Sequence, residues 1–138
     1  MKVRYSESKK IKPEQINELR YTIGWNKQRF KSNRNWTKIL KKSDFVISAW
    51  NGKMLVGFGR AFDDSVMFMI YDLMTRKEYQ RKGIGTAILK KLLKKAKNKK
   101  NYSFIGLFTS NAKSNEKIVE FYEKLGFKKA SIAMKLKV

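Results

Sequence analysis

The sequence predicts one domain over residues 1–138, of mixed α/β (α+β) class, with a mostly antiparallel sheet and one parallel crossover. Two observations carry this prediction. Apolar runs on either side of Asn51-Gly52 indicate an antiparallel hairpin, because this dipeptide suits a two-residue turn. The long apolar run from Val66 to Thr75 precedes a glycine-bearing turn and a helical run, an order typical of a strand–helix–strand crossover. The expected element order is β-α-α-β-β-β-α-β-α-β.

The first half of the chain is expected to supply three strands and two helices. Pro13 fits the first turn of a helix, where its missing N–H group costs nothing, and Gly24 fits the end of that helix. A second helix has Trp36, Ile39 and Leu40 on one side. The expected strands are 1–6, 44–50 and 54–62, and the expected helices are 13–24 and 33–42.

The second half begins with the apolar strand 66–75, whose composition is typical of a strand buried on both faces. An apolar stripe from Ile84 to Ala96, with lysines on the remaining surface, predicts the next helix. Gly126 fits the end of the last helix. The expected elements after residue 75 are a helix over 86–100, a strand over 103–109, a helix over 113–125 and a final strand over 127–138.

The composition excludes several kinds of chemistry. The chain has no cysteine and no histidine, which excludes thiolate nucleophiles, serine–histidine triads and most zinc sites, and no metal is expected. A net charge of +22 keeps a basic nucleic-acid-associated protein as an alternative, although a lysine-biased proteome gives the same balance. No apolar stretch reaches the roughly 20 residues that a membrane span needs, and no signal-peptide core is present. A cytoplasmic protein is therefore expected.

The segment Gln80-Arg81-Lys82-Gly83-Ile84-Gly85 lies between the strand 66–75 and the following helix. A turn at a helix start aims unpaired backbone N–H groups and the positive end of the helix at one point. Glycine is used where a side chain would block a ligand or where the backbone takes unusual angles. The segment predicts a site for a phosphate-bearing ligand at residues 81–86, with positive potential from Arg76, Lys77, Arg81 and Lys82.

Three features together resemble the GNAT N-acetyltransferase superfamily. Gln80-x-x-Gly83-x-Gly85 is similar to the acetyl-CoA signature of that family, and Tyr79 precedes it as is common there. Asn115 followed by Phe121-Tyr122-Glu123-Lys124-Leu125-Gly126-Phe127 is similar to the family's second motif. The resemblance covers nearly the whole chain. It implies the GNAT fold and an enzyme that transfers acetyl from acetyl-CoA to a primary amine by direct attack.

The resemblance also implies roles for single residues. Backbone groups after Gln80 would hold the pyrophosphate of CoA, Asn115 would bond the pantetheine arm, and the main chain at Met74 and Thr75 would contact the acetyl group. Tyr122 would protonate the departing thiolate, as a phenol that keeps its proton at neutral pH can do; a core aromatic is the alternative interpretation. The implied CoA-binding residues are Leu73, Met74, Thr75, Gln80, Arg81, Lys82, Gly83, Ile84, Gly85, Thr86 and Asn115.

The base and the acceptor are the remaining parts of the site. Many relatives carry a glutamate near the CoA-binding strand, whereas the strands 66–75 and 103–109 contain none here. Asp72 is the candidate base, and an ion pair between Asp72 and Arg60 is the alternative. In relatives the first two helices and their connection cover the acceptor, here Trp25 to Trp36. An acyl-CoA sensor without catalysis and a homodimer through exposed strand edges also stay open.

Overall fold

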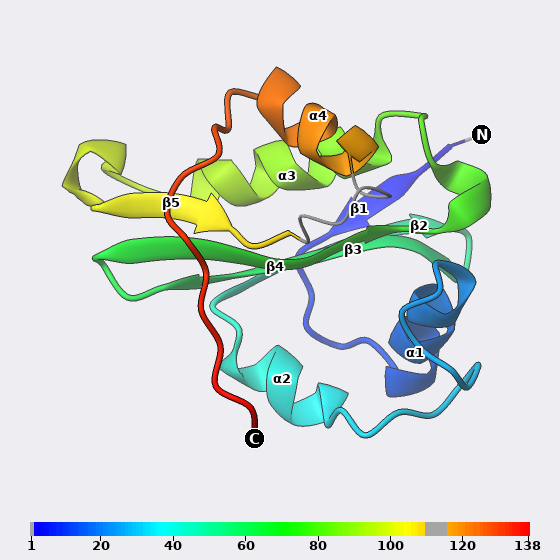
Figure 1. The fold of residues 1–138 in the computed structure, drawn as a ribbon. Coiled ribbons are helices and arrows are strands. Elements are labelled where there is room, and N and C mark those ends of the chain that lie inside the picture. The colour runs from blue at the N-terminus through cyan, green and yellow to red at the C-terminus, as the bar shows by residue number, and fades with distance from the viewer. Residues whose placement is uncertain (1, 110–115) are drawn as a thin grey trace.

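The computed structural model describes residues 2–109 and 116–138. The strands of this part form one sheet in the order β1-β2-β3-β4-β5, antiparallel except for the parallel pair β4–β5 (Figure 1). The mixed α/β fold class is therefore confirmed. The elements are β1 (Arg4–Ser6), α1 (Pro13–Thr22), α2 (Trp36–Lys42), β2 (Phe45–Asn51), β3 (Met54–Asp63), β4 (Met67–Thr75), the 3₁₀ turn η1 (Lys77–Tyr79), α3 (Ile84–Lys95), the 3₁₀ turn η2 (Lys99–Asn101), β5 (Phe104–Leu107) and α4 (Glu116–Lys124).

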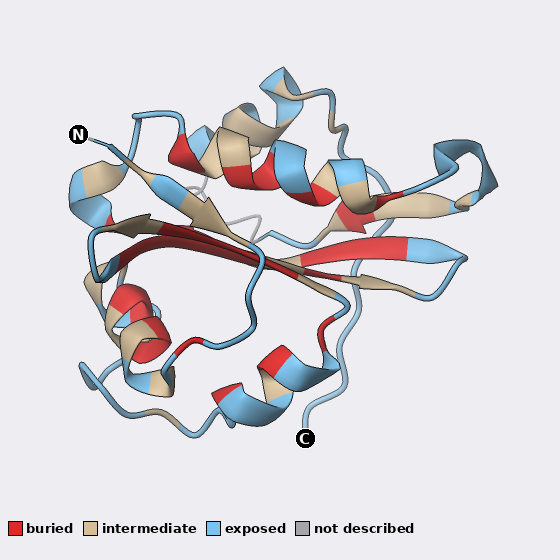
Figure 2. Cartoon of the chain, turned by 180° about the vertical axis from the view of Figure 1, so that it is seen from behind, coloured by how far each residue is buried: buried red, intermediate tan, exposed pale blue. Residues whose placement is uncertain are grey.

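Helices cover both faces of the sheet, with α3 and α4 on one face and α1 and α2 on the other (Figure 1). Buried residues line the central strands and the inward sides of the helices (Figure 2). One core cluster joins Ile88 and Leu92 of α3 to the strands. The other joins Leu19 of α1 and Trp36 of α2 to Phe58 of β3. The sheet thus has two separate apolar layers, one on each face.

Two helices, α2 and α3, have one end three or more residues inside the predicted bounds. α2 begins at Trp36 and not at residue 33, because the side chain of Asn35 caps it and accepts a hydrogen bond from the N–H of Lys38 at 3.1 Å. α3 ends at Lys95 and not at residue 100. Its apolar stripe ends with the buried Ala96, and Asn98 takes a left-handed φ of +53° that a helix cannot continue through.

The predicted final strand over 127–138 is wrong. The chain forms no strand after α4, and residues 128–138 are exposed. Figure 1 shows this segment leaving the α4 layer, passing β5 and ending on the side of α2. Alternating apolar residues specify which side chains share a face, but a strand also needs a neighbour that accepts and donates its backbone hydrogen bonds. The alternation at Ile132, Met134 and Leu136 carries no information about such a neighbour.

Two glycines of β3 let α3 lie close to the sheet. A Cβ atom on Gly57 would come within 2.8 Å of both Ile84 and Ile88, and one on Gly59 would come within 2.9 Å of Ile88. Real side chains do not approach this closely, so the isoleucine side chains or the helix that carries them would have to shift. The absence of these two side chains sets how near the first turns of α3 lie to β3.

Gly57→Ala is expected to lower the free energy of unfolding by about 1–3 kcal/mol, because the added methyl group overpacks the α3–β3 contact. Urea denaturation measures this change. Gly85→Ala is the control: a Cβ there meets nothing nearer than 3.5 Å, and alanine favours a helix, so stability should hold or rise. Wild-type stability of Gly57→Ala would contradict the close-packing argument.

Candidate active site

The turn before α3 is exposed at residues 81–83, and residues 84–86 of the first helical turn are buried or half-buried. Gly83 is the N-terminal cap of α3 with φ +83°, and Arg81 also has a positive φ of +62°. The first helical hydrogen bond runs from the N–H of Ala87 to the carbonyl of Gly83 at 3.0 Å. Within the described residues, none of the N–H groups of residues 81–86 donates to a protein acceptor. Such a run of free donors at the positive end of a 12-residue helix fits an anion.

Two side chains just before the turn fasten it to the sheet. Gln80 donates from Nε2 to the carbonyl of Thr75 at 3.0 Å, which links the turn to the end of β4. The hydroxyl of Tyr79 accepts from Nδ2 of Asn51 at 2.7 Å, which links it to the β2–β3 turn. Gln80, expected among the CoA-binding residues, therefore uses its amide N–H to brace the loop.

Arg76, which the sequence-based expectation places among the cations around the turn, is engaged in an ion pair with α1. Its side chain is buried, donates from Nε to the carbonyl of Leu55 at 3.1 Å and pairs through Nη2 with Glu18 of α1 at 2.7 Å. This ion pair holds α1 against the sheet and lowers the pKa of Glu18 below its usual value. The exposed Arg81 and Lys82 remain beside the turn.

β4 contains a bulge where the sequence predicts contacts to the acetyl group and the pantetheine arm. Phe58 lies opposite Met74 and Arg60 lies opposite Tyr71, so two residues of β4, 72 and 73, oppose Gly59 alone. Asp72 takes a φ of +54° there. The bulge includes Leu73, the first residue of the segment 73–75 that is expected to turn backbone groups toward the ligand.

The pairing of the two parallel strands ends just before the bulge. Their pairing runs from Met67 opposite Phe104 to Ile70 opposite Leu107. β5 ends at Leu107, whereas β4 continues to Thr75. In the described part of the chain, the edge of β4 that faces away from β3 has no strand partner beyond Ile70. Main-chain groups of the last residues of β4 can therefore bond a ligand at this edge.

Tyr122 lies on α4 with its ring packed between Phe121 and Phe127, at centroid distances of 5.1 and 5.8 Å. It contacts the core cluster of the α3 face. Burial raises the pKa of Tyr122 to about 12. Both interpretations of this residue are consistent with that position, since the ring packs in the core and the hydroxyl keeps its proton at neutral pH. Asn115, its expected partner along the pantetheine arm, lies outside the described residues.

Tyr122 also lines an open groove of about 1670 Å³ between β5, α4 and the C-terminal segment. The groove includes Phe104 to Thr109 on one side and Phe127 to Ala133 on the other. It does not extend to the turn at residues 80–86.

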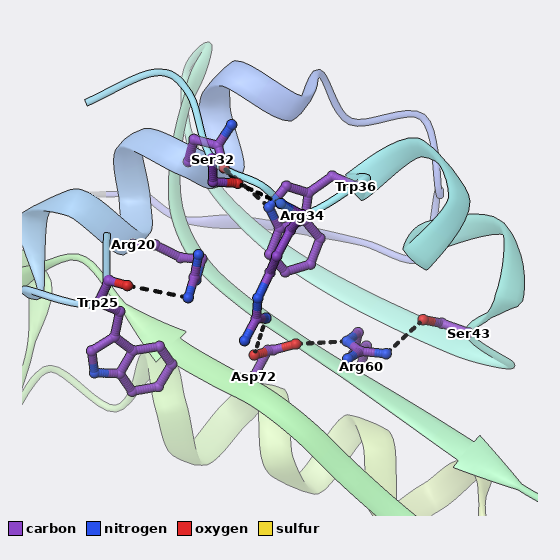
Figure 3. A network of polar contacts seen from close by, with 9 residues as sticks. Arg20, Trp25, Ser32, Arg34, Trp36, Ser43, Arg60 and Asp72 are labelled. Carbon is purple, nitrogen blue, oxygen red and sulfur yellow. Dashed lines mark hydrogen bonds and ion pairs between the residues drawn. The ribbon is translucent and has the colours of Figure 1, made fainter. Parts of the chain in front are cut away.

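Asp72 lies between two arginines on the face that α1 and α2 cover (Figure 3). Its Oδ2 accepts from Nε of Arg60 at 2.7 Å, and its Oδ1 accepts from Nη1 of Arg34 at 3.1 Å. The ion pair with Arg60 that the sequence left open is therefore formed. Both carboxylate oxygens are engaged, and a role for Asp72 as the base stays a prediction.

The sequence reasoning did not identify Asn17, which fixes the connection between α1 and α2. This buried side chain accepts from Nε1 of Trp36 at 3.1 Å and from Oγ of Ser32 at 2.8 Å, and donates to the carbonyl of Phe30 at 3.0 Å. Its position between Ile16 and Leu19 on the buried stripe of α1 was the available signal. A polar residue on an apolar stripe is costly unless hydrogen-bonded.

Two further properties concern the described residues only. No helix there has the length and apolar character that crossing a bilayer requires. No three acidic side chains gather there in a way that could hold a metal ion.

The sequence matches the acetyltransferase (GNAT) family over residues 12–127, and the chain belongs to this family. It is similar to the chloroplastic GCN5-related N-acetyltransferase 2 of Arabidopsis thaliana, with 34% identity over 76 residues. That match covers 54% of this chain and 27% of the Arabidopsis protein, so the chain corresponds to about a quarter of its relative's length.

Solved structures share the fold over almost the whole chain. A probable acetyltransferase from meticillin-resistant Staphylococcus aureus superposes with a TM-score of 0.79 at 23% identity, covering 99% of this chain and 100% of the other. A GNAT family acetyltransferase from Streptococcus pneumoniae gives a TM-score of 0.75 at 25% identity with the same coverage. A transcriptional regulator from Bacillus halodurans gives 0.76 at 22%, again covering 99% and 100% of the two chains.

Proposed function

We propose that this chain is an N-acetyltransferase that takes acetyl from acetyl-CoA and transfers it to a primary amine by direct attack. The observation that carries the proposal is the row of free N–H groups at residues 81–86, at the start of α3. A pyrophosphate is a doubly charged anion of a size that several main-chain donors can surround. The family to which the chain belongs makes CoA the expected source of that pyrophosphate.

The free edge of β4 supports a path for the rest of the ligand. In this proposal the pyrophosphate lies at the turn, and the pantetheine arm runs along the edge that β5 leaves open after Ile70. Main-chain groups of Met74 and Thr75 would hold the acetyl carbonyl, an arrangement of the oxyanion-hole kind. When bound, the thioester supplies the activated acetyl group.

Tyr122 is proposed as the general acid that gives a proton to the departing sulfur. Burial raises the pKa of Tyr122 to about 12, so its hydroxyl is protonated at neutral pH. A thiol in water has a pKa of about 8.5. The burial that disfavours a phenolate also disfavours a thiolate in the same place, because both are anions. The proton transfer is therefore less unfavourable than the two values alone suggest.

The acceptor amine must lose a proton before it attacks, because free alkyl amines are mostly protonated at pH 7. Asp72 is the proposed base, acting directly or through water. Asp72 is part of the bulge, two residues before Met74, the first of the residues proposed to hold the acetyl carbonyl. Ion pairs with Arg34 and Arg60 fix the orientation of that carboxylate.

Acetyl-CoA at 100 times its Kd is expected to stabilise the protein by about 2.7 kcal/mol, which a thermal-shift measurement detects. Gly83→Val should weaken acetyl-CoA binding about tenfold or more, since a β-branched residue resists the φ of +83° at the start of α3. Gly52→Val is the matched control, because Gly52 has a φ of +59° in the β2–β3 turn.

Two results would count against this part of the proposal. A wild-type protein that acetyl-CoA does not stabilise would rule out the proposed donor. Equal loss of binding in Gly83→Val and Gly52→Val would assign the effect to general destabilisation instead of to the turn.

Tyr122→Phe is expected to lower kcat by about 10²–10⁴-fold, the range for losing a general acid, while the Kd for acetyl-CoA changes little. Steady-state kinetics and calorimetry measure the two quantities. Tyr5→Phe serves as control, because Tyr5 is another half-buried tyrosine packed against the same core cluster. Parallel losses in kcat and affinity would identify Tyr122 as a packing residue.

Asp72→Asn is expected to lower kcat/KM and to change how it rises with pH. Raising the pH supplies more neutral amine without a base, so the gap to the wild type should narrow at alkaline pH. The measurement is a pH profile of kcat/KM for both proteins. A gap that is constant with pH would show that Asp72 orients the arginines and is not the base.

A further inference from the structure

Three guanidinium groups converge around Asp72 from separate elements (Figure 3). Arg20 comes from α1, Arg34 from the connection between α1 and α2, and Arg60 from β3. We call these three residues the arginine cluster. It lies on the sheet face that α1 and α2 cover, opposite to α3 and α4.

The arginine cluster has more positive charge than its carboxylate can balance. Asp72 pairs with Arg34 and Arg60. Glu18, also on α1, pairs with Arg29 and Arg76. Within the described residues Arg20 has no ion pair. Three cations therefore share one anion.

Arg20 is the least satisfied member of the cluster. Its residue is only 8% exposed, and its Nη2 donates to the carbonyl of Trp25 at 3.2 Å. Its Nε is buried and makes no hydrogen bond within the described part of the chain. Burial, followed by the charge of Arg34, lowers the pKa of Arg20. A buried guanidinium without a counter-ion is costly, and an added anion would offset that cost.

Aromatic rings surround the cluster. The guanidinium carbons of Arg20 and Arg34 lie 5.9 and 5.5 Å from the centre of the Trp36 ring. Arg60 lies 5.1 Å from the ring centre of Tyr71. The half-exposed Trp25 stands beside Arg20 and gives the cluster an aromatic side that faces solvent (Figure 3). Planar donor forks among aromatic rings suit a small organic oxyanion more than a hydrated ion.

We propose that the arginine cluster binds an oxyanion group, carboxylate or phosphate, carried by the amine acceptor itself. This inference rests on the proposed acetyl transfer and adds the class of acceptor. Asp72 holds Arg34 and Arg60, and the acceptor's oxyanion takes the unused donors of Arg20 and of the half-exposed Arg34. The acceptor is thus an acidic amine, although the protein as a whole is strongly basic.

The test compares acceptors that differ only in the anionic group. Phenylalanine is compared with phenethylamine for a carboxylate, and phosphoethanolamine with ethanolamine for a phosphate. In at least one pair, kcat/KM for the charged member should be about tenfold higher or more, the usual effect of charge-assisted hydrogen bonds. The pair that shows the preference identifies the oxyanion.

Arg34→Gln should remove this preference, because it removes guanidinium donors that the proposal assigns to the oxyanion. The variant should still fold, since the side chain of Arg34 is 42% exposed and its loss does not open the core. Arg4→Gln is the matched control: Arg4 also lies over a tryptophan ring, 5.8 Å from that of Trp50, but on β1. Arg20→Lys, which keeps the charge and loses the planar fork, should reduce the preference partially. A preference that survives Arg34→Gln, or one lost equally in Arg4→Gln, would overturn the proposal.

A binding measurement keeps this test separate from the proposed catalysis. N-acetylphenylalanine should stabilise the wild type in thermal shift more than N-acetylphenethylamine does, and Arg34→Gln should abolish the difference. Oxyanion-dependent stabilisation without any response to acetyl-CoA would reject the proposed transferase and keep the oxyanion site. Stabilisation by acetyl-CoA with no preference for charged acceptors or products would reject the oxyanion site and keep the transferase.

Discussion

The close approach of α3 to β3 is the constraint on which the candidate site depends. Because Gly57 and Gly59 have no side chains, Ile84 and Ile88 reach the strand directly. The first turn of α3, with Gly83 as its cap, is thereby fixed relative to the end of β4. The donors at residues 81–86 and the free edge of β4 are consequently held on one rigid frame, and a ligand that uses both needs little rearrangement of the main chain.

Residues at and next to the bulge in β4 contribute to both faces of the sheet. Met74 packs in the cluster below α1 and α2, whereas Leu73 packs in the cluster below α3. The extra residue at this point, Asp72, carries the carboxylate that organises Arg34 and Arg60. One irregularity in one strand thus sets both the main-chain groups proposed for the acetyl carbonyl and the charges proposed for the acceptor.

The sequence predicted the parts of the structure that depend on local pattern, such as the hairpin between β2 and β3 and the turn before α3. The two loop residues of the hairpin are Gly52 and Lys53, one position later than predicted, because Asn51 pairs with Met54. These features are encoded within a few residues, so spacing alone reveals them. Contacts between residues distant in sequence were harder to predict. The sequence suggests that Arg76 is one more cation near the turn, but its side chain pairs with Glu18, which is 58 positions earlier. The prediction of a final strand was wrong for the same reason. Alternating apolar residues show which side chains share a face of a strand, but they do not show which strand pairs with it. Asn17 shows that a polar residue within an apolar stripe marks a buried hydrogen-bonding role.

The donors at the start of α3 are main-chain atoms, and this affects how the site tolerates change. Replacing Arg81 or Lys82 by a residue other than proline would alter only the potential around the proposed anion site, because the backbone N–H groups remain. The sequence of the turn can therefore drift without loss of the donors, as long as the left-handed angle at Gly83 and the brace from Gln80 to Thr75 persist. The proposed ability of this turn to bind an anion depends on its backbone conformation. A search for binding sites that considers only side-chain chemistry would not find such a site.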